Sequence, residues 1–119
     1  MLTYQTNYPD QLDKIFSAIA NSVRRAIIEQ VAEKESTVNE LAEPHSISRP
    51  AISQHLRVLE NAGIIEQTLE GRIRICKLNV KPLSLAFSWL VRYRIFWEGL
   101  FDDIQEKVEA DTNLHEDVK

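Results

Sequence analysis

Two helix-start signals close together are the feature that most constrains the fold of this chain. Thr37 and Glu40 have the spacing of a capping box, in which each side chain satisfies a free backbone amide at the start of a helix, so a short helix begins there and ends before the next proline. Ser48 is a good cap for a second helix, which Gly63 stops. Two short helices joined by a few residues predict a helix-turn-helix over residues 37–62.

A β-hairpin is expected directly after the second helix. Two runs rich in β-branched side chains within residues 64–78 flank Glu70-Gly71, where glycine can adopt the positive φ of a two-residue turn. A helix-turn-helix followed by a hairpin is the order of a winged helix, so we expect a mostly α-helical winged helix-turn-helix with a small β-hairpin, the wing. Arg72 and Arg74 near the tip suit a wing that lies along phosphates or a minor groove.

Helical periodicity predicts further helices on both sides of this segment, and the whole chain, 1–119, is interpreted as one domain. Residues 10–33 divide at Asn21-Ser22 into two amphipathic helices. After Pro82 we expect one long helix to about residue 109, followed by a frayed polar tail. Its apolar residues recur at steps of three and four, close to a coiled-coil seam, at Leu83, Ala86, Leu90, Tyr93, Trp97, Leu100, Ile104 and Val108.

The second helix of the helix-turn-helix, residues 48–62, carries a polar face without an acidic residue. Ser53, Gln54 and Arg57 lie opposite an apolar face, and these residue types hydrogen-bond base edges in the major groove. We therefore interpret this segment as a recognition helix for double-stranded DNA. The candidate DNA-binding residues, including those expected to position the helix and hold the flanks, are Arg49, Ser53, Gln54, His55, Arg57, Arg72 and Arg74.

Two side-chain roles have competing interpretations. His55, near the edge of the apolar face, is expected to be a packed, hydrogen-bonded histidine or a phosphate contact rather than a metal ligand. Arg24 and Arg25 open the second predicted helix; they are interpreted as ordinary surface arginines, with a contact to the DNA backbone as the alternative.

The charge distribution supports DNA as the partner, although the net charge of the chain is −4. Residues 44–78 carry five Lys and Arg against three Glu, whereas the segments on either side are each net acidic. The single net-positive segment is thus the one that holds the helix-turn-helix and the wing. The acidity of the whole chain keeps a second hypothesis open, a winged-helix module that binds protein.

The segments FSAIANSVRRAIIEQV and TVNELAEPHSISRPAISQHLRVLENAGIIEQTLEGRIRICKLN resemble the ArsR/SmtB family of bacterial winged-helix repressors. The resemblance covers about residues 12–110, and the aromatic-rich run WLVRYRIFW is similar to that of a subgroup without metal-sensing ligands. It implies a homodimeric repressor whose terminal helices form the interface and whose two recognition helices enter successive major grooves of a pseudo-palindromic operator. The implied interface residues are Leu12, Phe16, Leu90, Tyr93, Trp97, Leu100, Phe101 and Ile104.

Departures from the family pattern limit what the resemblance implies. Metal-sensing members carry cysteines in the first helix of the helix-turn-helix, and residues 38–42 contain none. Asp102 and Asp103 lie on the last helix, but His115 lies in the tail, so we expect no metal site. Pro44 and Ser46 stand where relatives have a continued helix and a glycine, which leaves the individual base contacts open.

The remaining expectations concern chemistry, effectors and location. With three glycines and no nucleophile-base motif, we expect neither an enzyme nor a cofactor. Six of the nine aromatic residues lie within 87–101; we interpret them as a dimer seam, with an effector pocket as the alternative. Cys76, the single cysteine, is interpreted as a small packed hydrophobe rather than an oxidant sensor. Without a signal peptide or membrane span, a cytoplasmic location is expected.

Overall fold

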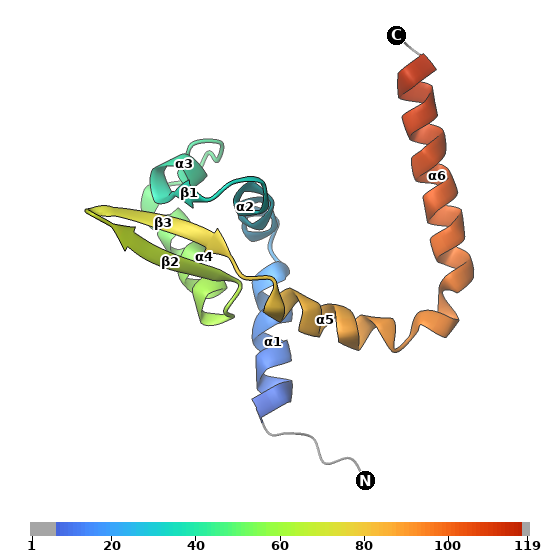
Figure 1. Cartoon of the computed structure of the whole chain (residues 1–119), viewed down its shortest axis with the longest axis horizontal. Coiled ribbons are helices and arrows are strands. Elements are labelled where there is room, and N and C mark those ends of the chain that lie inside the picture. The colour runs from blue at the N-terminus through green and yellow to red at the C-terminus, as the bar shows by residue number, and fades with distance from the viewer. Residues whose placement is uncertain (1–6, 118–119) are drawn as a thin grey trace. The chain divides into compact units, whose positions relative to one another are not determined.

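The structure is a computed structural model that describes residues 7–117, with side chains described for residues 10–100 and 102–110. The chain divides into two compact units, the first ending at Ala86 and the second beginning at Phe87. Helices dominate both units, and a small sheet lies in the first (Figure 1). No helix in the described part of the chain is long and apolar enough to cross a membrane.

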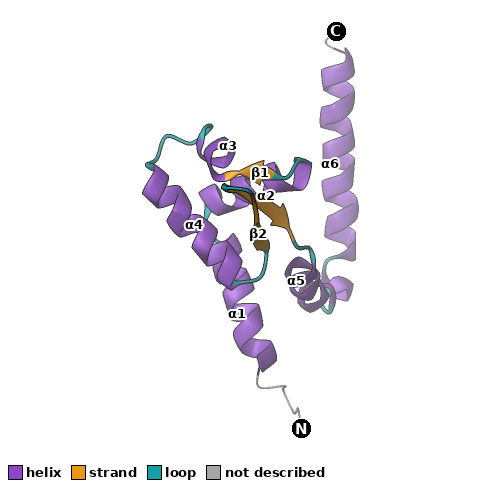
Figure 2. Cartoon of the chain, turned by 60° about the vertical axis from the view of Figure 1, so that its left-hand side comes forward, coloured by secondary structure: helices purple, strands orange, loops and turns teal. Residues whose placement is uncertain are grey.

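The first unit has the predicted winged helix-turn-helix architecture. In chain order it contains α1 (Asn7–Ile19), α2 (Ser22–Glu33), β1 (Ser36–Thr37), α3 (Val38–Ala42), α4 (Arg49–Asn61), β2 (Ile65–Glu70), β3 (Ile73–Leu78) and the first part of α5 (Lys81–Val91). Figure 2 shows α3 and α4 joined by a loop as the helix-turn-helix. The strands form an antiparallel sheet in the order β1-β3-β2.

The predicted helix starts are confirmed by their hydrogen bonds. Asn21 caps α2. Thr37 Oγ1 accepts from Glu40 N at 3.2 Å, and Thr37 N donates to Glu40 Oε1 at 2.9 Å, which completes the capping box of α3. Ser48 Oγ accepts from Ala51 N at 3.2 Å and so starts α4. These local bonds decide where the two helices of the helix-turn-helix begin.

The end of α4 follows the predicted glycine. Gly63 has φ +77°, its N–H donates to Glu60 O at 2.9 Å, and the N–H of Ile64 donates to Leu59 O at 3.0 Å. These two bonds form a Schellman motif, which turns the chain sharply from the helix into the sheet. A Cβ at position 63 would lie 3.4 Å from Pro82 Cγ, an ordinary contact, so the positive φ rather than the packing favours glycine here.

The sheet differs from the expected hairpin in two details. Glu70 pairs with Ile73, so the two turn residues are Gly71-Arg72 rather than Glu70-Gly71. Gly71 alone adopts a positive φ, +66°, at the first turn position, which is a type II′ turn. The short strand β1 was not predicted; it forms only because its two residues pair with β3, through Ser36 opposite Cys76.

The core of the first unit lies between the helices and the sheet. Its fully buried side chains come from α1 to α4, β2, β3 and the link before β2, and include Ile15, Ile27, Leu41, Ile52, Leu56, Leu59, Ile64, Ile65 and Cys76. The prediction that Cys76 is a packed hydrophobe is confirmed, because its side chain is 0% exposed within this core. Helix α4 therefore has one buried face, which fixes the direction of its opposite, polar face.

The expected single helix over 82–109 is wrong. Helix α5 ends at Val91, a 3₁₀ turn η1 (Arg94–Phe96) follows, and α6 (Glu98–Asp117) begins after it. Three successive i to i−3 bonds, from the N–H groups of Tyr93, Phe96 and Trp97, replace the α-helical pattern. The run is rich in aromatic and β-branched residues, which lose side-chain freedom in a helix. The tail beyond residue 109 also differs from the expectation, since α6 continues to Asp117.

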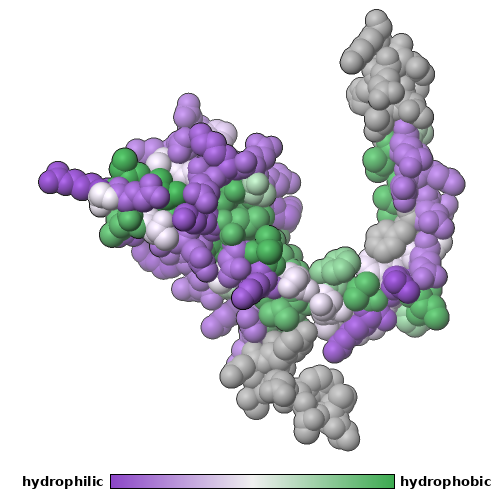
Figure 3. All heavy atoms as spheres, viewed as in Figure 1, coloured by the Kyte–Doolittle hydropathy of each residue, from purple (hydrophilic) through white to green (hydrophobic). Residues whose placement is uncertain are grey.

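Within the second unit, apolar side chains remain exposed in the single chain. Figure 3 shows hydrophobic atoms along one edge of α6 and hydrophilic atoms along the other. Leu100, Ile104 and Val108, four residues apart on α6, are exposed by 54–60%. Ile95 and Phe96 of η1 are 78% and 80% exposed. Exposed apolar surface of this extent is typical of an interaction surface.

Candidate DNA interface

Helix α4 turns its polar side to solvent. Its buried residues are Ile52, Leu56 and Leu59. Ser53, Gln54 and Arg57 are exposed on the other side of the helix, as the sequence predicted. Arg57 Nη1 donates to Gln54 Oε1 at 3.2 Å, so the two side chains lie together as one hydrogen-bonding group. A face of this kind offers several hydrogen-bond donors and acceptors of the types that pair with base edges.

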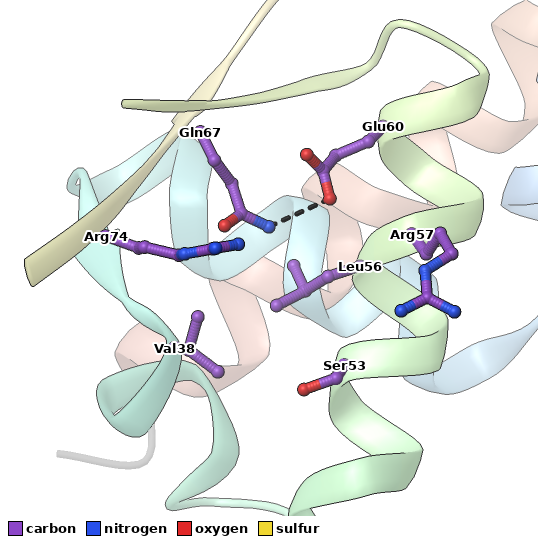
Figure 4. Close-up of a pocket in the computed structure, with 7 residues that line it drawn as sticks. All are labelled: Val38, Ser53, Leu56, Arg57, Glu60, Gln67 and Arg74. Carbon is purple, nitrogen blue, oxygen red and sulfur yellow. Dashed lines mark hydrogen bonds between the residues drawn. The ribbon is translucent and has the colours of Figure 1, made fainter. Parts of the chain in front are cut away.

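A groove runs between this helix and the wing (Figure 4). One part is a pocket of about 360 Å³ lined by Val38, Ser53, Leu56, Arg57, Glu60, Gln67 and Arg74. A second pocket of about 300 Å³ shares two of these residues and is lined by Thr37, Val38, Asn39, Arg49, Arg72, Ile73 and Arg74. The groove thus brings together five of the seven predicted DNA-binding residues, from α4, the wing turn and β3. Gln54 lies beside it through its bond to Arg57.

Strand alternation explains how Arg74 reaches the groove. Successive side chains of a strand point to opposite faces, so Arg74 shares a face with Cys76. Cys76 is buried in the core and stands opposite Gln67 of β2, which places all three on the side of the sheet that faces the helices. Figure 4 shows the Arg74 side chain extending from β3 toward α4. Arg72 occupies the turn itself.

The groove is predominantly cationic. Four exposed arginines line it, and Glu60 is the acidic residue among its lining. Glu60 Oε1 accepts from Gln67 Nε2 at 2.9 Å, whereas the buried Gln67 Oε1 has no hydrogen-bond partner among the described residues. Glu60, Gln67 and Asn39 were not among the predicted site residues. The strand alternation that points Gln67 toward the helices was the sequence signal that could have identified it.

The structure does not bring His55 into the groove. Its ring is half-buried on another side of α4, where Nδ1 lies 3.1 Å from Arg24 Nη1. The prediction of a packed, hydrogen-bonded histidine is therefore confirmed. Burial lowers the pKa of His55, and the charges of Arg24 and His45 lower it further. The preferred interpretation of Arg24 as an ordinary surface arginine is wrong, because its guanidinium is partly buried and bonds to two other helices.

The residues expected at a dimer interface fall in both units. Leu12 is 9% exposed and belongs to the core of the first unit, so little of it is free for a partner, and Phe16 is half-buried against that core. In the second unit Leu90, Tyr93, Leu100 and Ile104 are exposed by 39–60%, and Trp97 is half-buried. The side chain of Phe101 lies outside the described residues.

The described side chains offer no metal centre. Among them, no group of three or more His, Cys, Asp or Glu residues lies together in a way that could hold a metal ion. Asp102 and Asp103 are exposed on α6, and the side chain of His115 lies outside the described residues.

Comparison with known proteins places the chain in a family. Residues 21–67 match the family model for "Bacterial regulatory protein, arsR family". The chain is 40% identical over 99 residues to the HTH-type transcriptional regulator Rv2034 of Mycobacterium tuberculosis. This alignment covers 83% of this chain and 90% of the relative. It is 29% identical over 82 residues to the transcriptional repressor SdpR of Bacillus subtilis, covering 69% and 91%.

A solved structure agrees with the sequence relatives. The crystal structure of the ArsR family transcriptional regulator RHA00566 superimposes with a TM-score of 0.71 and 34% identity, over 82% of this chain and 97% of that one. By its sequence and by its fold, this chain belongs to the ArsR family of bacterial transcriptional regulators.

Proposed function

We propose that this protein is a homodimeric repressor that occupies a pseudo-palindromic DNA operator. The observation that carries the proposal is the groove that Arg49, Arg57, Arg72 and Arg74 line beside the exposed polar face of α4. Guanidinium groups bind phosphates through charge-assisted hydrogen bonds, and an exposed polar helix face of this kind can enter a major groove. The transcriptional repressor SdpR among the relatives supports repression rather than activation.

Each candidate residue other than His55 has a proposed role in this interface. Ser53, Gln54 and Arg57 read base edges from α4, with Arg57 and Gln54 acting as one pair because they are hydrogen-bonded. Arg49, at the first turn of α4, binds a phosphate and sets the register of the helix. Arg72 at the wing turn and Arg74 on β3 bind the flanking backbone, which carries no sequence information by itself.

We further propose that two copies associate through the apolar surface of the second unit. The chain exposes Leu100, Ile104 and Val108 along one side of α6, and aromatic residues at η1. A second copy is the partner favoured here, because a twofold dimer places two recognition helices about one helical turn of DNA apart. In the second unit the proposed interface comprises Leu90, Tyr93, Trp97, Leu100, Phe101 and Ile104. Phe16 of α1 is proposed as a further interface residue in the first unit.

Selection of bound duplexes from a random pool tests this function. We expect a pseudo-palindrome with half-sites about 10 base pairs apart, centre to centre. Arg57→Ala is expected to relax the preference at one position of each half-site, whereas Arg72→Ala should weaken binding to all sequences alike. Both variants should keep the dimer intact. Recovery of no duplex, together with capture of a protein ligand by the same face, would support a protein-binding module instead.

A further inference from the structure

Arg24 joins three helices of the first unit. From α2, its Nε donates to Ala18 O at 2.7 Å and its Nη2 donates to Ser17 O at 3.0 Å, both near the carboxyl end of α1. Its Nη1 lies 3.1 Å from His55 Nδ1 on α4. The last carbonyl groups of a helix lack hydrogen-bond donors within that helix and carry partial negative charge. This end of α1 is therefore a favourable binding position for a guanidinium group. The recognition helix is thereby tied to α1 through one side chain.

The bond between Arg24 and His55 requires a neutral histidine. A guanidinium can only donate hydrogen bonds, so Nδ1 of His55 must carry a lone pair, and its ring proton must reside on Nε2. A proton on Nδ1 would remove the bond and place two cations in contact. Among the described residues, the charged groups that lower the pKa of His55 are Arg24 from α2 and His45 from the loop before α4, and α1 contributes the backbone carbonyls that hold Arg24.

The same bond lies on the helix that carries the residues proposed to read DNA, on another side of it. His55 is two residues from Ser53 and two from Arg57 along α4. Side chains that read bases must be held to within about half an ångström, so a change in how His55 packs displaces them. We propose that Arg24 is a positioning residue for DNA binding, which holds the recognition helix through neutral His55, so that protonation of His55 weakens operator binding. The proposal rests on the DNA-binding function proposed above.

The direction of the pH effect separates this role from a phosphate contact. Burial and the charges of Arg24 and His45 lower the pKa of His55 below its ordinary value of 6.5. The stability that neutral His55 adds to the folded protein is therefore fully present above pH 6.5. The contribution is lost as the pH falls through the lower pKa of the folded protein. A histidine that contacts phosphate would behave in the opposite way, because protonation adds a positive charge and tightens DNA binding.

The test measures operator binding by the full chain in a pH series from about 8 down to the lowest pH at which circular dichroism shows a folded protein, at constant ionic strength. We expect the Kd of the wild-type protein to rise as the pH falls through the lowered pKa of His55. His55→Asn places a non-titrating acceptor where Nδ1 lies, and it should bind as wild type at pH 8 with the rise largely removed. His45→Gln, which removes the other nearby histidine, should retain the rise.

A matched pair of arginine variants tests the positioning residue itself. Arg24→Lys keeps the charge but cannot bond all three acceptors at once, so we expect weaker binding at pH 8 and a smaller pH effect. Arg25→Lys is the control, because exposed Arg25 donates to Ile19 O at the same end of α1 without reaching α4. A wild-type Kd that is constant or falls at low pH, or a His55→Asn variant that keeps the rise, would overturn the proposal. Failure to bind any duplex at pH 8 would instead contradict the proposed function.

Discussion

Gln67 Nε2 on β2 donates to Glu60 Oε1 on α4 at 2.9 Å, and this bond ties the wing to the last turn of the recognition helix. Glu60 is also the acidic residue in the lining of an otherwise cationic groove. Its acceptor oxygen therefore orients the wing, while its negative charge opposes the approach of phosphate. The two properties can be separated by substitution.

The charge and the hydrogen bond of Glu60 should affect different measurements. Glu60→Gln keeps an oxygen that can accept from Gln67 and removes the charge, so we expect unchanged stability and tighter DNA binding. Glu60→Ala removes both and should lower the free energy of unfolding by about 1 kcal/mol. Urea denaturation and anisotropy with a fluorescent duplex measure the two effects. Weaker DNA binding by Glu60→Gln would show that the carboxylate itself is needed at the interface.

Substitutions at Ser48, the cap of α4, should also change protein stability and DNA affinity independently. Ser48→Ala removes the acceptor for Ala51 N and should cost about 1 kcal/mol of stability. Ser48→Asn and Ser48→Asp should both restore the cap. The aspartate variant should nevertheless bind DNA more weakly than the asparagine variant, because its carboxylate stands next to Arg49. Equal DNA affinities for the two variants would show that the start of α4 does not approach phosphate.

Cys76 should be unreactive while the protein is folded. Its thiol is fully buried, and burial, aided by the charge of Glu60, raises its pKa to about 11. Thiolate, the reactive form, is therefore scarce near neutral pH. We expect an aromatic disulfide reagent to label Cys76 only at the rate of unfolding and promptly in urea. Rapid labelling of the folded protein, accompanied by loss of DNA binding, would favour an oxidant sensor.

The apolar side of α6 should determine the oligomeric state. Leu100→Glu combined with Ile104→Glu places charges on the exposed apolar stripe, and we expect the dimer to dissociate while the first unit stays folded. Asp102→Ser combined with Glu106→Ser, on the opposite side of the helix, is the matched control and should remain dimeric. Size-exclusion chromatography with light scattering reports the mass. A dimer that survives the glutamate substitutions would place the interface elsewhere.

Local sequence signals were sufficient to predict much of the fold of the first unit. The capping box at Thr37, the cap at Ser48 and the glycine at position 63 each act through bonds to residues within about five positions, so the sequence alone shows them. The hairpin was recognisable from Gly71 for the same reason, although the turn lies one residue later than expected. Strand β1 has two residues and exists only through pairing with β3, a contact that no local pattern reveals.

The wrong predictions concern features that depend on residues distant in the sequence. A stripe of apolar residues at steps of three and four is equally compatible with one long helix and with two helices separated by a 3₁₀ turn, so the break after Val91 was not visible. The environment of Arg24 depends on where α1 ends and on which side of α4 packs against it. Periodicity placed His55 near the apolar face correctly but could not identify the group that meets it.

Salt dependence of operator binding tests the central claim of a cationic, twofold DNA reader most directly. If Arg49, Arg72 and Arg74 of both copies meet phosphates, the logarithm of the Kd should rise with the logarithm of salt concentration with a slope of about five. Arg72→Ala should reduce that slope by about two, because one contact is lost in each copy. An operator affinity that does not change between about 50 and 200 mM salt would contradict the account.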